Sequence, residues 1–397
     1  MAMRSGKPVV LLGFAQAFAA IEAAWSLQDA GMQVVAFARR GTRSALSRMR
    51  DVIVHEVTPP EVSIEGCLAD VAALVAQVQP DGILPLDDAS LWLTSCLIYD
   101  HAELVGPSPD AAAIALDKWG QVQAAQLAGL RVPPTRLAHS ASELGELDWP
   151  VVVKPAEAVR VEGDRLTRPR GVIAADRAEL DAARAGLGDG PLLVQPYLTG
   201  VGEGVFGYVN EHGVAALSAH RRVRMVNPHG SASSACTSID VEPELEVSVR
   251  ELIASLQWRG LFMVELLRDD DGVPWFMELN GRAWGSLALA RRRGFEYPAW
   301  ATQHALGMPQ SPAQPTAPGP ITARHLGREI AHLLFVLRGP QSQAVTEWPG
   351  RLSTVRQLVR VSRDDRLYNW NPHRPSVLVG DTIDTLRDLV SGRRRAG

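Results

Sequence analysis

The stretch Phe262-Met263-Val264-Glu265, followed after a short turn by Trp275-Phe276-Met277-Glu278-Leu279-Asn280-Gly281-Arg282, decides the fold of this 397-residue chain. Two apolar, aromatic runs on either side of an acidic turn that ends in Gly272 predict a β-hairpin. Glu278 and Asn280 are two residues apart, so they share one face of their strand, and the hairpin can bring Glu265 opposite them. Three oxygen ligands on adjacent strands suit a hard cation. On spacing alone, an ordinary amphipathic hairpin with solvated carboxylates explains the same pattern.

The first hundred residues predict a different architecture, a parallel and doubly wound sheet. Short apolar strands alternate there with helical stretches, which is typical of βαβ units. The strands are expected at residues 9–12, 33–38, 52–57 and 83–85. The turn after the first strand is GFAQAFA, which lacks the GxGxxG glycines and argues against a dinucleotide site. Asp87-Asp88 follow the strand at 83–85, at the edge where ligands of parallel sheets collect.

The segments between these two regions carry lysines at defined places. A helix over residues 110–129 contains Asp117-Lys118, and the buried strand Val151-Val152-Val153 ends in Lys154-Pro155. A buried strand seldom ends in an unpaired charge, which makes Lys154 a stronger candidate than Lys118. Lys118, taken alone, is better explained as a solvated lysine on the helix surface.

In this order, the motifs resemble those of the ATP-grasp superfamily, which includes D-alanine–D-alanine ligase, biotin carboxylase and the amino-acid ligases. The arrangement of Glu265, twelve residues, then Glu278-x-Asn280-x-Arg282 is similar to the metal-binding element of that superfamily. The resemblance covers residues 8–305. It implies a two-lobed ATP-grasp domain that binds ATP and two Mg²⁺ ions, with Mn²⁺ as a substitute.

The resemblance also implies a role for each matching residue. The metal ligands would be Glu265, Glu278 and Asn280, and Arg282 would hold the transferred phosphoryl group or the acyl-phosphate oxygen. The nucleotide would be bound by Lys118, Lys154, the hinge residues Gln195, Tyr197 and Leu198, and the ribose-binding Glu203. Glu203 stands between two glycines, so a loop carboxylate is the alternative.

Two features depart from the superfamily pattern. Pro196 has no N–H to offer adenine, so adenine recognition would depend on Gln195 and the backbone around Tyr197 and Leu198. The phosphate-covering loop at 158–170 is rich in arginine instead of glycine and serine, which predicts a longer, basic flap. A solvated charged loop is the alternative for this segment.

A second arginine cluster, His220-Arg221-Arg222-Val223-Arg224, lies on an expected strand. Alternation sends His220, Arg222 and Arg224 to one face. We expect Arg222 and Arg224 in the substrate cleft, with Arg221 as the competitor. The small polar residues that follow, 227–238, predict a mobile loop that closes over a substrate.

Composition excludes several classes of protein. The chain is 46% hydrophobic and 21% charged, and its net charge of −4 provides no basic field for nucleic acid or an anionic membrane. Its three cysteines form no CxxC pair, which fits a reducing compartment, and no apolar run is long enough to span a bilayer. We therefore expect a cytoplasmic protein, with a homodimer as one option for its assembly.

We accordingly expect a Rossmann-like domain at 1–112, ATP-grasp small and large lobes at 113–198 and 199–308, and a linker with a C-terminal accessory unit at 309–397. The predicted function is an ATP-dependent ligase that joins a small-molecule carboxylate to an amine through an acyl phosphate. Two alternatives stay open. One is a carboxylase or carbamoyl-phosphate-type enzyme, and the other is a regulatory module that binds ATP without catalysis. The sequence does not assign the role of residues 309–397.

Overall fold

A computed structural model describes residues 6–97, 99, 101–139, 141–230, 232–309 and 319–390. The N-terminal part is a five-stranded parallel sheet in the order β3-β2-β1-β4-β5. The strands are β1 (Val9–Gly13), β2 (Gln33–Arg39), β3 (Val52–Val57), β4 (Gly82–Pro85) and β5 (Glu103–Leu104), and the helices that accompany them are α1 (Ala20–Asp29), α2 (Ile64–Val78) and α3 (Asp88–Cys96). A 3₁₀ turn covers Ala45–Arg48. The expected doubly wound sheet is thus confirmed.

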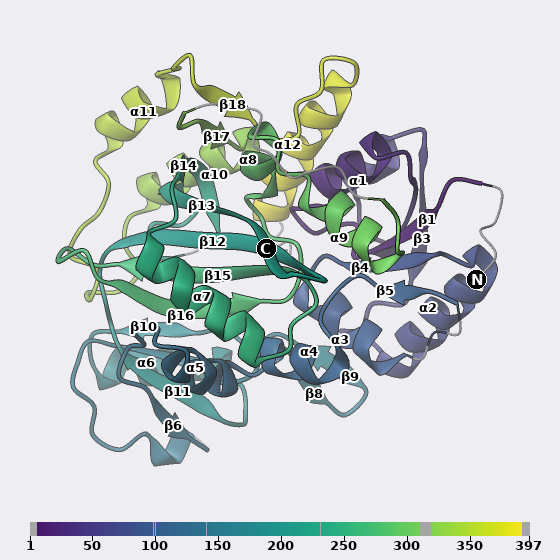
Figure 1. Cartoon of the computed structure of the whole chain (residues 1–397). Helices are drawn as coiled ribbons and strands as arrows, with labels where there is room; N and C mark the ends of the chain where they lie inside the picture. The colour runs from purple at the N-terminus through teal and green to yellow at the C-terminus, as the bar shows by residue number, and fades with distance from the viewer. Residues whose placement is uncertain are drawn as a thin grey trace.

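A small antiparallel sheet lies at the bottom of the molecule in Figure 1. Its strand order is β10-β7-β11-β6, formed by β6 (Arg136–Ala138), β7 (Val151–Pro155), β10 (Val172–Ala174) and β11 (Leu192–Pro196). Helix α6 (Arg177–Ala183) packs against β10. The arginine-rich flap is itself a hairpin, β8 (Arg160–Glu162) and β9 (Arg165–Thr167), and not an extended loop.

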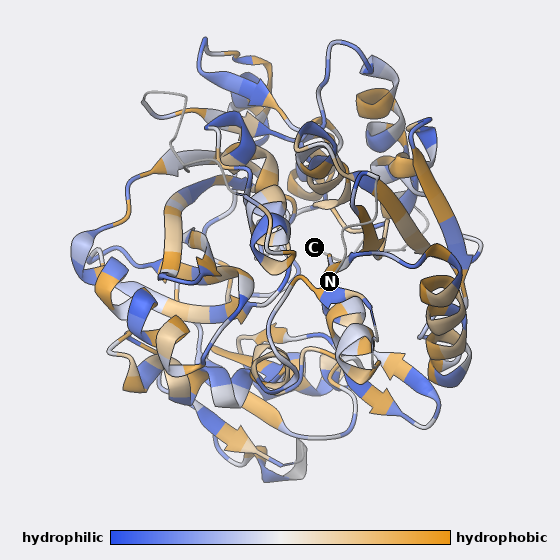
Figure 2. Cartoon of the chain, turned by 45° about the vertical axis from the view of Figure 1, so that its right-hand side comes forward, coloured by the Kyte–Doolittle hydropathy of each residue, from blue (hydrophilic) through white to orange (hydrophobic). Residues whose placement is uncertain are grey.

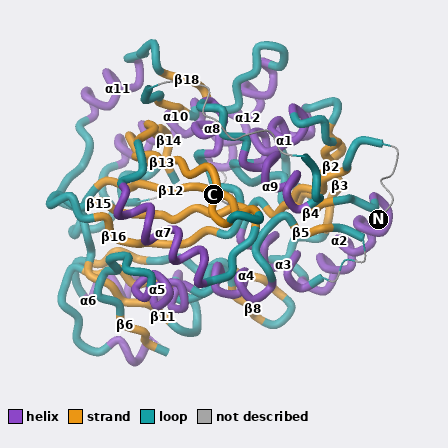
Figure 3. The backbone as a smooth tube through the Cα atoms, viewed as in Figure 1, coloured by secondary structure: helices purple, strands orange, loops and turns teal. Residues whose placement is uncertain are grey.

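The largest sheet has seven strands and crosses the centre of the molecule (Figure 1). Its order is β16-β15-β12-β13-β14-β17-β18. The strands are β12 (Val201–Asn210), β13 (Gly213–Met225), β14 (Ser233–Ile239), β15 (Gly260–Arg268), β16 (Pro274–Asn280), β17 (Thr322–Arg324) and β18 (Asp365–Leu367). Helix α7 (Pro243–Ser255) packs against β13 and lies in front of the sheet in Figure 3.

The C-terminal part extends this large sheet. Strands β17 and β18 form its last two members, and α10 (Leu326–Arg338) packs against both α11 (Arg351–Val359) and α12 (Pro375–Val390). The expected helix near 328–337 is α10. Of the proline-rich linker expected at 309–320, residues 310–318 lie outside the described residues.

Two local expectations are wrong. The helix expected over 110–129 is two helices, α4 (Pro109–Leu116) and α5 (Lys118–Leu127), because Asp117 has an extended backbone and caps α5 with its side chain. The segment expected to be a loop at 227–238 is strand β14 from Ser233 onward, because its small side chains fit between β13 and β17.

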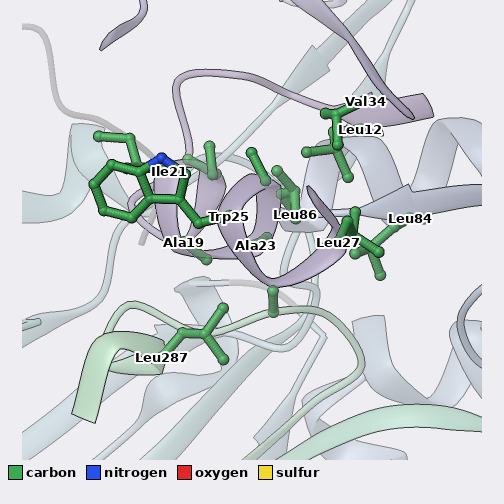
Figure 4. Packing of buried hydrophobic residues seen from close by; sticks show 14 of the residues in the cluster. Leu12, Ala19, Ile21, Ala23, Trp25, Leu27, Val34, Leu84, Leu86 and Leu287 are labelled. Carbon is green, nitrogen blue, oxygen red and sulfur yellow. The ribbon is translucent and has the colours of Figure 1, made fainter. Parts of the chain in front are cut away.

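The core joins these parts into one body. Helix α1 packs Leu27 beside Leu84 of the parallel sheet and also packs against helix α8 (Leu287–Arg292), where Leu287 lies (Figure 4). Helix α9 (Tyr297–Ala305) packs against α1 and against strands β12 and β15. Hydrophobic residues accordingly concentrate on the strands and on the inner sides of the helices (Figure 2). No helix in the described part of the chain is long and apolar enough to cross a membrane.

Candidate active site

The hairpin of β15 and β16 brings three oxygen-bearing side chains to one cavity. Glu265 is the cross-strand partner of Glu278, and Met263 is the partner of Asn280. Glu265, Glu278 and Asn280 all line the same cavity. Two carboxylates and an amide on one wall are a donor set that suits a divalent cation with oxygen ligands. Within the described ranges, no cluster of three His, Cys, Asp or Glu side chains could hold a metal. An ion bound here would therefore also need Asn280 and oxygen atoms from a substrate.

Protein cations approach both carboxylates of the hairpin. Arg222 Nη2 lies 2.5 Å from Glu265 Oε1, and Lys118 Nζ lies 3.7 Å from Glu278 Oε2. These contacts show that the carboxylates lie in a position where positive charge is stabilised. A divalent ion would bring positive charge to the two carboxylates. A polyphosphate bound to that ion would bring negative charge to Arg222 and Lys118.

Lys154 approaches the same place from β7. Its Cα pairs with Leu193 of β11, and burial lowers the pKa of its ammonium group to about 8. Lys118 lowers that pKa further, while Glu278 and Glu265 oppose the shift. Lys154 and Lys118, which the sequence places 36 positions apart, thus both interact with Glu278. This basic pair is suited to hold phosphate groups.

Arg282 lies beyond the hairpin and is held by the N-terminal domain. Its Nε lies 2.9 Å from Asp88 Oδ1, and it is buried, with 5% of its surface exposed. The other oxygen of Asp88 accepts a hydrogen bond from Arg168 Nη2 of the flap at 2.6 Å. Burial alone would raise the pKa of Asp88, but Arg282 and Arg168 outweigh it and hold that pKa well below its usual range. Arg282 and Arg168 both line the cavity.

Strand β13 separates the arginines that the sequence places together. Arg222 faces the cavity beside Glu265, whereas Arg221 pairs with Glu203. The register of β13 on β14 shifts between Arg222 and Arg224, so the expected alternation breaks there. Arg224 forms a bidentate pair with Glu329 of α10 and is not among the residues that line the cavity. The structure therefore brings Arg222, and not Arg224, to the predicted cleft.

Glu203, the expected ribose ligand, is deeply buried. Its Oε1 lies 2.8 Å from Arg221, and its Oε2 lies 2.9 Å from Arg268 of β15. Both carboxylate oxygens are thus engaged by arginines. A ribose hydroxyl would share these oxygens with two charged groups.

Residues 195–198, the expected hinge, lead from the small antiparallel sheet to β12 of the seven-stranded sheet. The Gln195 side chain donates to Thr135 Oγ1 at 2.8 Å, and the Tyr197 amide donates to the Pro150 carbonyl at 3.0 Å. Both of these donors are therefore used within the small lobe. Leu198 is the next hinge residue whose backbone could face a base, and it lies between the small lobe and β12.

The far wall of the cavity comes mostly from residues that the sequence patterns did not identify, the exceptions being His220, which alternation put beside Arg222, and Ser233, in the segment expected to close over a substrate. The residues of this wall are His220, Ser233, Gly285, Ser286 and Arg328. Arg328 of α10 donates to the Ser233 carbonyl at 2.9 Å, and its guanidinium lies 3.3 Å from the centre of the Phe18 ring. The C-terminal unit thus completes the cavity, a role that the sequence left open.

His220 and Trp284 present polar edges to this wall. Ser286 Oγ lies 2.9 Å from His220 Nδ1, and the Trp284 ring stacks on Phe206 at 4.6 Å. His220 Nε2 and Trp284 Nε1 are buried and have no hydrogen-bond partner in the part of the chain that the structure describes. Burial, together with Arg222, holds the pKa of His220 well below its usual value, so its imidazole is neutral. The only sequence signal for these residues was the alternation that put His220 beside Arg222.

Known proteins resemble the part of the chain that carries this geometry. The family "ATP-grasp in the biosynthetic pathway with Ter operon" matches residues 189–328, which contain the hinge, the hairpin and Arg328. Residues 189–328 thus match an ATP-grasp model, as the motifs of the sequence predict. A curated relative, the carbamoyl phosphate synthase large chain of Xanthomonas campestris pv. campestris, is 25% identical over 244 residues. That match covers 54% of this chain but only 21% of the relative.

Solved structures share the fold over most of the chain. The L-amino acid ligase of Bacillus licheniformis superposes with a TM-score of 0.61 at 18% identity, and the match covers 81% of this chain and 80% of the ligase. The biotin carboxylase of Campylobacter jejuni gives a TM-score of 0.60 at 17% identity, covering 79% of this chain and 74% of that protein. An N5-carboxyaminoimidazole ribonucleotide synthetase bound to ADP gives 0.62 at 15% identity, with 90% and 97% of the two chains covered. At these identities, the likeness establishes the fold.

Proposed function

We propose that this protein is an ATP-dependent ligase that joins a small-molecule carboxylate to an amine, with release of ADP and phosphate. The observation that carries the proposal is the register of the hairpin, which sets Glu265 opposite Glu278 in a cavity shared with Asn280, Arg222 and Arg282. This arrangement combines ligands for a metal–nucleotide complex with two cations positioned for a phosphoryl group in transfer.

The roles follow from charge and position. Lys118 and Lys154 would bind phosphate oxygens, and the backbone near Leu198 would contact adenine while Glu203 reaches the ribose. Glu265, Glu278 and Asn280 would hold Mg²⁺, as one or two ions and with Mn²⁺ as a substitute. Bound Mg²⁺ would offset the charge that develops on the β- and γ-phosphates. Arg282 and Arg222 would stabilise the phosphoryl group as it moves to the substrate carboxylate.

The acceptor half of the site supports an acid and an amine as substrates. Arg328 presents a cation on the far wall, and the neutral imidazole of His220 can accept a hydrogen bond from an amine. We propose amino acids or other small acids as the carboxylate. The division into domains at 1–112, 113–198, 199–308 and 309–397, a homodimeric assembly and a cytoplasmic location belong to the same proposal.

Hydroxylamine tests this function because it can replace the amine, whatever the natural amine is. It is a small nucleophile that converts an acyl phosphate into a stable hydroxamate. We expect ATP-dependent hydroxamate formation with at least one acid of a panel of amino acids and small acids, with one ADP released per hydroxamate. A paired amine screen by mass spectrometry then identifies the amide product. ATP binding with no ADP formed across the whole panel would favour the non-catalytic regulatory module.

The curated match to carbamoyl phosphate synthase favours one second candidate, a carboxylase or carbamoyl-phosphate-type activity. Such an enzyme activates bicarbonate, so its ADP release should depend on added bicarbonate. The release should stop in buffer from which carbon dioxide and bicarbonate have been removed. The ligase should instead depend on the organic acid and be indifferent to bicarbonate. The same ADP assay therefore separates the two functions.

A further inference from the structure

Asp88, the first residue of α3, contacts two arginines that come from other parts of the chain. Its Oδ1 lies 2.9 Å from Arg282 Nε, and its Oδ2 lies 2.6 Å from Arg168 Nη2. The carboxylate is buried, with 4% of the residue exposed. One group of the N-terminal domain thus links the flap to the arginine that follows the metal hairpin.

The neighbouring Asp87 has a different task. It caps α3, where its carboxylate accepts from the Ser90 amide at 2.7 Å, and it also pairs with Arg39 at 3.2 Å. The two consecutive aspartates therefore divide into a structural cap and a group that holds two arginines of the cavity lining. A role for Asp88 is separable from the folding of α3.

The flap has a second, independent contact with the N-terminal domain. Asp164, in the turn between β8 and β9, accepts from Ser63 Oγ at 2.6 Å and from the Glu65 amide at 2.9 Å. These contacts lie at the start of α2 and involve neither Arg282 nor Asp88. The Leu166 amide of the flap also donates to the Pro60 carbonyl at 2.8 Å, and of these contacts only the one with Asp88 involves a residue that lines the cavity, Arg168.

We propose that Asp88 is a positioning residue that couples closure of the flap to the orientation of Arg282. Each carboxylate oxygen of Asp88 binds one guanidinium group. When the flap closes and Arg168 reaches Asp88, the carboxylate therefore holds Arg282 in one orientation. Two arginines and one carboxylate leave a net positive charge toward the cavity, as a transferring phosphoryl group requires. Without Asp88, the two guanidinium groups would repel each other and Arg282 would lose the carboxylate that orients its Nε. This inference rests on the role proposed for Arg282 in phosphoryl transfer.

A phosphoryl mimic tests the coupling. ADP, Mg²⁺ and aluminium fluoride form a planar analogue of the group in transfer, so the affinity of the trapped complex is compared with that of Mg²⁺–ADP alone. We expect Asp88→Asn to weaken the trapped complex about a hundredfold, as for a misplaced catalytic group, and Mg²⁺–ADP less than about threefold. Arg168→Gln should weaken the trapped complex about tenfold. Asp164→Asn is the matched control: it weakens the side-chain contacts of the flap with α2 and should leave the trapped complex unchanged.

Trypsin reports on the flap in the same variants, through cleavage after Arg165. The trapped complex should protect this site in the wild type and in Asp164→Asn, but not in Asp88→Asn or Arg168→Gln. If Asp88→Asn unfolds, Asp88→Glu is used instead, since it keeps the negative charge but moves it. This variant should weaken the trapped complex, while the complex should still protect Arg165 from trypsin.

Three results would overturn the inference. One is a trapped complex of near-native affinity in the Asp88 variant. The second is equal losses in the Asp88 and Asp164 variants, since Asp88 would then only dock the flap. The third is a loss at Asp88 with none at Arg168, which removes the coupling. Neither assay needs an acid or an amine, so a failed ligation screen would count against the proposed function alone.

Discussion

The two walls of the cavity are built in different ways. The metal wall comes from one hairpin, in which the register of β15 on β16 fixes Glu265 opposite Glu278 within a span of 16 residues from Glu265 to Asn280. The far wall takes His220 from β13, Ser233 from β14 and Arg328 from α10, which are up to 108 positions apart. Local register thus determines the first wall, and tertiary contacts determine the second. Changes on the first wall should abolish chemistry, and changes on the second should alter substrate use.

The largest effect is expected from Glu278→Ala. It removes a metal ligand whose side chain is partly exposed, so turnover should fall by at least about a thousandfold while the fold is retained. ADP release at saturating Mg²⁺ measures the loss, and thermal melting checks the fold. Glu251→Ala, on the exposed side of α7, is the control and should behave as the wild type. Near-native turnover in Glu278→Ala would show that the hairpin does not bind the metal.

The Lys154→Met substitution should separate the effect of this lysine on ATP binding from its effect on the stability of the free protein. Methionine has a similar length but no charge, so ATP affinity should fall about 10- to 100-fold with the loss of a charge-assisted contact to phosphate. The free protein should melt at a higher temperature, because the wild type buries an ammonium group at pH 7. Calorimetric titration with ATP and a melting curve give both values. A variant that loses stability but binds ATP normally would mean that Lys154 only fills the core.

The same lysine predicts a pH dependence. Its pKa of about 8 means that the free protein loses this charge as the pH rises through 8, whereas bound phosphates would favour the protonated form. ATP affinity should therefore fall from pH 7.5 to 9, by up to about tenfold per pH unit, with proton uptake on binding. Lys154→Arg keeps its charge throughout this range and should flatten the profile. A profile that is equally steep in both proteins would assign the titration to another group.

The contrast between the walls also explains what the sequence could predict. The parallel sheet and the hairpin follow from hydrophobic patterns that repeat about every two residues in strands and about every 3.6 residues in helices. Short stretches of sequence contain these patterns in full. The bulge between Arg222 and Arg224 leaves no such pattern, so alternation wrongly placed Arg224 beside Arg222. Arg328 stands in an amphipathic helix, and nothing in its neighbourhood indicates that α10 packs against β14 at the cavity. Long-range packing, rather than local propensity, selects these residues.

Arg328→Met probes the acceptor wall and should have a smaller effect. The guanidinium is the contribution of the C-terminal unit to the cavity, so we expect the KM of the acid or the amine to rise about tenfold. The KM of ATP should stay within about twofold, because Arg328 is not on the metal wall. Steady-state kinetics with each substrate varied in turn separates these values. Equal losses for all three substrates, together with a lower melting temperature, would point to a purely structural arginine.

The smallest effect on catalysis is expected from Arg224→Met. Arg224 is bound by both oxygens of Glu329, which Arg324 and Ser234 also contact, so its pair joins β13 to the C-terminal unit. Its loss leaves Glu329 with one arginine instead of two. Unfolding should therefore become easier by about 1–3 kcal/mol, while kcat and every KM stay within about twofold. Chemical denaturation and steady-state kinetics measure the two effects, with Arg222→Met as the matched variant that should lose turnover. If Arg224→Met raised the KM of the acid without loss of stability, β13 would present both arginines to the substrate, and alternation along the strand would have been the better guide.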